Sequence, residues 1–230
     1  MSEPLRIALV GATGLVGRSV IAACMGRHDI RLIGISRREV ALPDGARMEM
    51  IVADPNRWGE VIAAVEPTAL ISALGTTMKQ VGGDQDAFRA VDQDLVLNTA
   101  RSAQEAGVRH MVSISSVGAD PQSKNFYLSV KGEVDRQLST MGFKRLDILR
   151  PGLLRGERQD DARFAEGLAQ VVSPFVDPFL HGKWRAYHSI SGKTVAQGAL
   201  GFAMRKAQGR FTHDYDGICR AAREWLKRGG

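Results

Sequence analysis

Six short apolar segments alternate with helix-like segments along this chain, and the alternation predicts an α/β fold with a doubly wound parallel sheet flanked by helices. Most of these segments are continuously apolar, as strands buried on both faces of a parallel sheet are. A length of 230 residues suits a single domain over 1–230 with one good core. The expected strands are Arg6–Val10, Ile30–Ile35, Met48–Val52, Thr68–Ala73, His110–Ile114 and Asp147–Leu149.

The first strand runs directly into a glycine-rich turn and then into a helix that is expected to extend to about Met25. Gly11 permits the tight turn, Gly14 lets the backbone approach a pyrophosphate, and Gly17 lets the helix lie close to the strand. The helix N-terminus would then point at the phosphates, since its free amide groups attract anions. This order of elements predicts a dinucleotide site built from Gly11, Thr13, Gly14, Leu15, Val16 and Gly17.

The residues after the second and third strands bear on the choice of nucleotide. NAD-specific proteins usually place an acidic residue at the end of the second strand, where it holds the ribose hydroxyls. This chain has Ser36-Arg37-Arg38 instead, and arginine presents a planar, permanently charged fork to phosphate oxygens. We therefore expect NADP(H) to be preferred, with NAD(H) left open. Asp54 would accept a hydrogen bond from the adenine amino group, or it would only cap a turn before Pro55.

The fifth strand leads to Ser115-Ser116, and Tyr127 and Lys131 follow at helical spacing. Side chains four residues apart share one face of a helix, so the phenol and the ammonium would share a pocket wall. The cation favours phenolate and brings the phenol, whose ordinary pKa is about 10, closer to working pH. Tyr127 could then pass a proton to or from a substrate oxygen held by Ser116. The alternative is an aromatic packed on a helix beside a solvated lysine.

These motifs resemble the short-chain dehydrogenase/reductase superfamily, and more closely its atypical branch related to the human HIV Tat-interacting protein. The resemblance covers nearly all of residues 5–200. It implies a Rossmann-like domain that binds NADP(H), with Ser116, Tyr127 and Lys131 at the catalytic positions. The segments that carry it are Gly11–Gly17, Arg37-Arg38, Leu74-Gly75-Thr76-Thr77, Val91-Asp92-Gln93-Asp94, Ser115–Asp120, Tyr127–Val134 and Arg150-Pro151-Gly152.

The same resemblance implies further cofactor contacts, from Leu74, Gly75, Thr76, Ser115, Pro151 and Gly152. The chain departs from the wider superfamily in two ways. It has Leu74-Gly75 where many relatives have an Asn-Ala-Gly type of segment, and Ser116 precedes Tyr127 by only eleven residues. Members of the branch are also described as regulators or interaction proteins, so a homodimer or a protein partner stays open.

Residues 153–190 are expected to form a small cap over the active site that selects the substrate. An amphipathic helix is expected over Asp161–Val172, and His188 would line the pocket or close a hydrogen bond within the cap. Gly82-Gly83 suggests a loop that orders over the cofactor. Either an anionic substrate or solvent would face the arginines of the cap, Arg155, Arg158 and Arg163.

The net charge of +6 comes from dispersed basic residues, without the like-charge runs or aromatic-basic interleaving of nucleic-acid binders. We therefore expect no nucleic-acid partner. The segment 220–228 is expected to form an amphipathic helix with Trp225 and Leu226 packed on the body. Cys24 and Cys219 are expected to be inert, and the histidines show no metal-ligand spacing.

The first strand begins near Leu5, and no apolar run approaches the ~18 residues of a membrane span. We therefore expect no signal peptide, no membrane partner and a cytoplasmic protein.

The expected activity is that of an NADP(H)-dependent dehydrogenase/reductase acting on a small-molecule carbonyl or hydroxyl substrate. Ser116 would orient the substrate oxygen, Tyr127 would exchange its proton, and Lys131 would hold the nicotinamide ribose, while hydride chemistry belongs to the cofactor. An epimerase or dehydratase with bound cofactor is an alternative, although the small cap argues against a nucleotide-sugar substrate. The other alternative is an NADP(H)-binding regulatory or scaffold protein, which does not require Tyr127.

Overall fold

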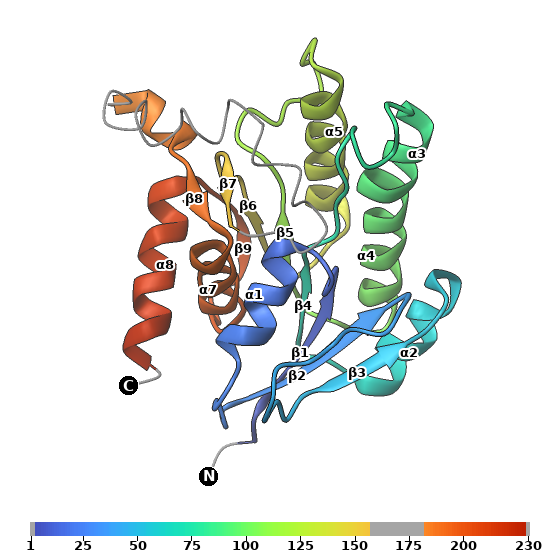
Figure 1. Cartoon of the computed structure of the whole chain (residues 1–230), viewed down its shortest axis with the longest axis vertical. Helices are drawn as coiled ribbons and strands as arrows, with labels where there is room; N and C mark the ends of the chain where they lie inside the picture. The colour runs from blue at the N-terminus through green and yellow to red at the C-terminus, as the bar shows by residue number, and fades with distance from the viewer. Residues whose placement is uncertain (1–2, 157–181, 229–230) are drawn as a thin grey trace.

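The computed structural model describes residues 3–156 and 182–228, which contain a seven-stranded sheet with helices on both faces (Figure 1). Every pairing between neighbouring strands of this sheet is parallel. The predicted α/β class with a doubly wound parallel sheet is confirmed. In spatial order the strands are β3 (Glu49–Val52), β2 (Ile30–Ser36), β1 (Leu5–Val10), β4 (Ala69–Ser72), β5 (His110–Ile114), β6 (Arg145–Leu149) and β9 (Gly209–His213).

Two layers of helices enclose the sheet. One face carries α1 (Leu15–Ala23), α7 (Gly192–Ala203) and α8 (Tyr215–Arg228), and the other carries α2 (Trp58–Val65), α4 (Val96–Glu105) and α5 (Phe126–Thr140). The shorter elements are the turn η1 (Pro55–Arg57), α3 (Gln85–Arg89), the π-helical segment η2 (Ala90–Leu95), η5 (Gly182–Tyr187) and the two-stranded ribbon β7 (Leu154–Arg155) and β8 (Ile190–Ser191). None of the helices in the described ranges is long and apolar enough to cross a membrane.

Successive side chains of the central strands point to opposite helical layers, which explains why the strands are continuously apolar. In β1, Ile7 and Leu9 belong to the core shared with α1, α7 and α8. Ala8 and Val10 belong to the core shared with α2, α4 and α5. A strand with only one covered face would alternate with polar residues, so this pattern requires both layers.

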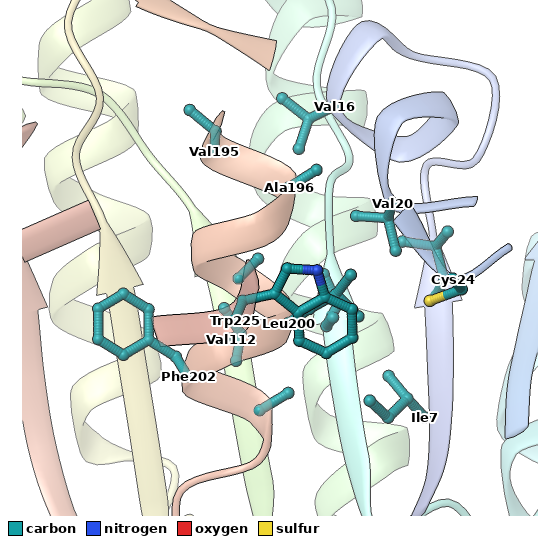
Figure 2. Packing of buried hydrophobic residues seen from close by; sticks show 14 of the residues in the cluster. Ile7, Val16, Val20, Cys24, Val112, Val195, Ala196, Leu200, Phe202 and Trp225 are labelled. Carbon is teal, nitrogen blue, oxygen red and sulfur yellow. The ribbon is translucent and has the colours of Figure 1, made fainter. Parts of the chain in front are cut away.

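Helix α7 lies at the centre of the first core, where Ala196 and Leu200 pack with Val20 of α1 (Figure 2). Its glycines let α8 approach closely, since a Cβ on Gly201 would stand 2.7 Å from a backbone oxygen of α8. Trp225 of α8 is buried in the same core, as predicted.

The prediction that Leu226 also packs on the body is wrong, because this side chain is 56% exposed. Neighbouring residues on a helix point about 100° apart, so burial of Trp225 turns the next side chain toward solvent. The expected inertness of Cys24 fits its surroundings, since burial raises the pKa of its thiol to about 12.

The six predicted strands match β1 to β6 within about two residues at their ends. Strand β9 was not predicted. It lies at the edge of the sheet, and its three central residues, Arg210, Phe211 and Thr212, are exposed, so it has no buried apolar run to reveal it.

Strand order creates a crevice between the carboxyl ends of β1 and β4. The chain progresses outward from β1 through β2 to β3 on one side, and from β4 toward β9 on the other, so β1 and β4 flank the point where the order reverses. Ligands of open α/β sheets bind at such a switch point. The glycine turn follows β1 here, and Leu74-Gly75-Thr76 follows β4.

A buried polar cluster joins three strands beyond this crevice. Asp147 of β6 lies 2.8 Å from Nε2 of His110 in β5 and 2.7 Å from Nε2 of His213 in β9, and it accepts a hydrogen bond from Arg145 Nε at 2.6 Å. Burial alone would raise the pKa of this carboxyl, but the hydrogen bonds from both histidines and the arginine hold the pKa well below its usual range.

We expect Asp147→Asn to lower the free energy of unfolding at pH 7 by about 3–5 kcal/mol, because it leaves a buried arginine without its counter-charge. A carboxyl with a lowered folded-state pKa contributes stability above the unfolded pKa of about 3.9 and loses it as the pH falls. In urea titrations the difference in the free energy of unfolding between wild type and variant should therefore become smaller below about pH 4. Asp44→Asn in an exposed loop is the control, and a gap that stays constant from pH 7 to pH 3 would contradict this account.

Candidate active site

The three glycines of the first turn have different surroundings. Gly11 has φ +85°, and a Cβ there would lie 2.4 Å from the carbonyl carbon of Ala73 at the end of β4. A Cβ on Gly17 would lie 2.1 Å from the oxygen of Gly11. A Cβ on Gly14 would make only ordinary contacts, the nearest at 3.5 Å, so no protein neighbour requires glycine at this position.

Two cavities meet at the crevice, with volumes of about 340 and 320 Å³. Their walls share seven residues, so together they form one groove across the carboxyl ends of β1 and β4. Tyr127 and Lys131 line one end of the groove, and Arg37 and Arg38 line the other. The shared residues are Thr13, Gly14, Ala73, Leu74, Gly75, Thr76 and Gln80.

The arginine end of the groove lies after β2. Arg37 and Arg38 are exposed, and within residues 3–156 and 182–228 neither guanidinium forms an ion pair. The preceding Ser36 is buried and donates its hydroxyl hydrogen to the Arg38 carbonyl oxygen at 2.5 Å, which shapes the turn.

Asp54 lies outside both cavity walls. It caps η1, with its carboxylate accepting from the Asn56 amide at 2.9 Å. The turn-capping alternative for this residue is therefore observed, and its contact with adenine stays a prediction.

The opposite end of the groove is built by the start of α5. Asn125 caps this helix by accepting from the Leu128 amide at 3.1 Å, which places Tyr127 in the first turn and Lys131 one turn later. The Tyr127 ring packs edge-on against the fully buried Phe88 of α3, with 5.7 Å between ring centroids. Both members of the pair line the cavity, so the phenol and the ammonium share a wall as the spacing predicts.

Lys131 is buried, and its Nζ lies 2.7 Å from the Asp92 carboxylate. Burial lowers the pKa of this ammonium, but the Asp92 carboxylate and the nearby Tyr127 phenol raise it by more, so the pKa lies above its ordinary value. The ion pair with Asp92 therefore favours the charged form of Lys131.

The two serines after β5 are placed differently. Ser115 is buried and lines the cavity with Tyr127 and Lys131. Ser116 is half-buried, its hydroxyl lies 3.3 Å from the Val117 carbonyl oxygen, and it is not among the residues lining the two cavities. The role of Ser116 stays a prediction, with Ser115 as the neighbour that competes for it.

Pro151 and Gly152, which are predicted to contact the cofactor, are not among the residues that line the two cavities, so their contact stays a prediction. Gly152 packs so tightly that a Cβ would stand 2.3 Å from the His188 carbonyl oxygen. The ribbon β7–β8 begins just after it, and Leu154 of β7 lines the cavity. Most of the predicted cap 153–190 lies outside the described residues, including the expected Asp161–Val172 helix, Arg158 and Arg163.

Several residues of the groove were not predicted as site residues. Arg18 lies one turn into α1, where i+4 spacing from Gly14 is the available signal. Gln80 accepts from the Thr76 hydroxyl at 3.2 Å and lies in a loop without a regular pattern. Asp92 belongs to a segment used for the family resemblance, but nothing in its spacing from Lys131 indicates that the two side chains meet.

This groove suits a nucleotide, because it combines a close-packed glycine turn, a helix N-terminus and two arginines that have no ion-pair partner among the described residues, at a topological switch point. An NAD(P)H-binding family model matches residues 11–175. The chain belongs to this NAD(P)H-binding family.

Among curated proteins, the mitochondrial protein fmp52 of Aspergillus niger is 32% identical over 210 residues, covering 88% of each chain. The fmp52 protein of Aspergillus fumigatus is 36% identical, covering 72% of this chain and 76% of that protein. FMP52-1 of Scheffersomyces stipitis is 32% identical, covering 85% of this chain and 86% of that protein.

Solved structures share the fold at low identity. MoeE5 in complex with UDP-glucuronic acid and NAD matches with a TM-score of 0.68 and 14% identity, covering 90% of this chain and 75% of that one. A UDP-N-acetylglucosamine 4-epimerase from Methanobrevibacter ruminantium matches with a TM-score of 0.68 and 12% identity, covering 93% of this chain and 77% of that one. The predicted NAD(P)-binding family is thus supported by the family match, and these structures show that the chain shares their Rossmann-like fold.

The prediction of a cytoplasmic protein is wrong, because these curated relatives are named as mitochondrial proteins. The prediction rested on the early first strand and on the lack of a long apolar run, and neither feature identifies the compartment in which a protein works.

The contrast between Gly14 and Gly17 is testable. We expect Gly17→Ala to lower the free energy of unfolding by about 1–3 kcal/mol, because the added methyl group collides with backbone atoms that cannot move aside. Gly14→Ala should leave unfolding within about 0.5 kcal/mol of wild type. It should nevertheless raise the Kd for NADPH about tenfold, equivalent to about 1.4 kcal/mol. Urea unfolding measures the stability of both variants, and calorimetric titration measures their affinity for NADPH. Equal losses of stability in the two variants would contradict the assignment of Gly17 to packing and Gly14 to nucleotide binding.

Proposed function

We propose that this protein is an NADP(H)-dependent oxidoreductase of the atypical short-chain dehydrogenase/reductase type, acting on a small-molecule carbonyl or hydroxyl substrate. The observation that carries the proposal is the single groove joining Arg37 and Arg38 to Tyr127 and Lys131. One extended ligand in this groove would have its phosphate near the arginines and its reacting end near Tyr127 and Lys131.

The residues of the groove suit a dinucleotide that carries a 2′-phosphate. Gly14 lines both cavities without a neighbour that needs glycine, which suits a position where a ligand approaches the backbone. The exposed pair Arg37 and Arg38 supports NADP(H), because two exposed guanidiniums attract a 2′-phosphate, whereas NAD(H) offers only hydroxyls there.

The bound cofactor would supply or accept the hydride. The protein's part is to position the substrate and move a proton. Tyr127 would exchange a proton with the substrate oxygen, and the buried cation of Lys131 would stabilise the phenolate that forms. Ser116, or its neighbour Ser115, would hold the same oxygen by a hydrogen bond. The cap over the active site predicted for residues 153–190 stays part of this proposal.

The preference for NADP(H) is tested by calorimetric titration with NADPH and NADH. We expect wild type to prefer NADPH, and Arg37→Ala/Arg38→Ala to raise the Kd for NADPH at least about tenfold while changing NADH binding little. Arg47→Ala, an exposed arginine in the same loop, is the control. Equal affinity of wild type for both nucleotides would reject the arginine assignment, and failure to bind either would favour a scaffold protein.

Tyr127→Phe tests the proton-transfer step. We expect it to leave the Kd for NADPH within about twofold and to lower turnover by about 10²–10⁴, the usual contribution of a positioned acid or base. Turnover is followed as NADPH oxidation with a panel of aldehydes, ketones and quinones. Tyr215→Phe removes a phenol that lines neither cavity and serves as control. Undiminished turnover in Tyr127→Phe would reject its role.

The same assay separates the two serines. Ser116→Ala is expected to lower kcat more than Ser115→Ala, with little change in NADPH affinity for either. A larger loss in Ser115→Ala would move the substrate-orienting role to the serine that lines the cavity. Binding of NADPH by wild type without any turnover on the panel would favour the regulatory alternative.

A further inference from the structure

One buried acid at the groove has no assigned role. Asp92 is 1% exposed and lies in η2, the π-helical segment between α3 and α4. A π-helical turn is rare and occurs often at functional sites, because it displaces one residue from the regular helix face. Burying a carboxylate is costly unless strong partners compensate it.

The two carboxylate oxygens of Asp92 contact two different parts of the groove. Oδ2 accepts a hydrogen bond from the Thr76 amide at 2.6 Å, and Oδ1 lies 2.7 Å from Lys131 Nζ. Gly75 lies against this contact, since a Cβ on it would stand 3.5 Å from Asp92 Oδ1 and 3.9 Å from Lys131 Nζ. The loop after β4 and the lysine of α5 are therefore joined through one side chain.

The loop after β4, which Asp92 holds through the Thr76 amide, forms part of the wall of both cavities. Gly75 and Thr76 line each of them, and Lys131 lines only the end with Tyr127. A change at Asp92 would thus act on the proton-transferring end directly and on the rest of the groove through the Thr76 amide.

We infer that Asp92 is a positioning residue for the reaction, holding Lys131 in place as a cation and fixing the loop that lines the cofactor groove. This inference rests on the proposed oxidoreductase function. It assigns Asp92 no contact with substrate or cofactor, because its two oxygens are engaged by Thr76 and Lys131.

The electrostatic part of the argument follows from burial. Three titratable groups face Lys131 in the described part of the chain: Asp92 from η2, and Tyr127 and Asp135 from its own helix. Asp92 is the one that forms an ion pair with it. The Asp135 carboxylate forms its ion pair with Arg150 instead, at 2.9 Å, so Asp135 is the weaker counter-charge for Lys131. Burial also raises the pKa of Asp135, against the lowering effects of Ser115 and the Arg150 guanidinium. Without Asp92, burial would favour the neutral amine, which cannot stabilise a phenolate.

Asp92→Asn separates charge from shape, because the amide oxygen still accepts from Thr76 while the negative charge is lost. With NMR on lysine labelled with ¹³C and ¹⁵N, we expect the pKa of Lys131 to fall by about one pH unit or more. The alkaline limb of the pH profile of kcat/KM should move to lower pH with it, and kcat should fall about tenfold or more. Asp94→Asn removes an exposed acid from the same segment and should change neither profile.

An unchanged Lys131 pKa and pH profile in Asp92→Asn would overturn the inference, and a loss of stability without these shifts would show a purely structural role. If Asp92→Asn does not fold, Asp92→Asn/Lys131→Met removes both charges. Recovery of folding in the double variant would support the counter-charge role, and failure to recover would contradict it. If wild type shows no turnover, the oxidoreductase proposal fails, whereas the titration of Lys131 still decides whether Asp92 sets its charge.

Discussion

The turn after β1 lies so close to the end of β4 that no side chain fits between them. Gly11 faces the backbone of Ala73 at this contact, and Gly17 in turn faces Gly11. These two close approaches set the position of α1 against the sheet and leave its N-terminus at the switch point between β1 and β4. Because the backbones meet at glycines, no side chain fills the space beside this contact. The groove occupies that space, and Gly14 lies in its wall.

The charges of the groove are arranged in two different environments. At one end Arg37 and Arg38 are exposed and unpaired within the described residues, so their charge is available to a ligand. At the other end Lys131 is buried with Asp92, where the low dielectric strengthens their attraction and makes an uncompensated charge expensive. An exposed pair of cations suits recognition of a mobile anion, whereas a buried ion pair suits a group that must keep one position and one charge.

The strands and the candidate site residues could be predicted from the sequence to different extents. Strands β1 to β6 were predictable because two helical layers demand continuous apolar segments, and the Tyr127–Lys131 wall followed from i, i+4 spacing. Strand β9 carries no such pattern, because it lies at the edge of the sheet with an exposed centre. Leu226 was misplaced for a related reason: an amphipathic helix shows which residues are apolar, but its rotation is set by packing against α7.

The α/β class, the glycine turn, the arginine pair and the tyrosine–lysine pair could all be predicted from the amino-acid sequence, since each depends on residues close together in the chain. The contacts of Asp92 with Lys131 and Thr76, and the place of Ser115 rather than Ser116 in the cavity wall, became known from the packed structure. These contacts join β4, η2, β5 and α5, which are far apart in sequence. Which side chain of each element faces the groove depends on helix rotation and on how the strands end, and packing of the whole domain sets both.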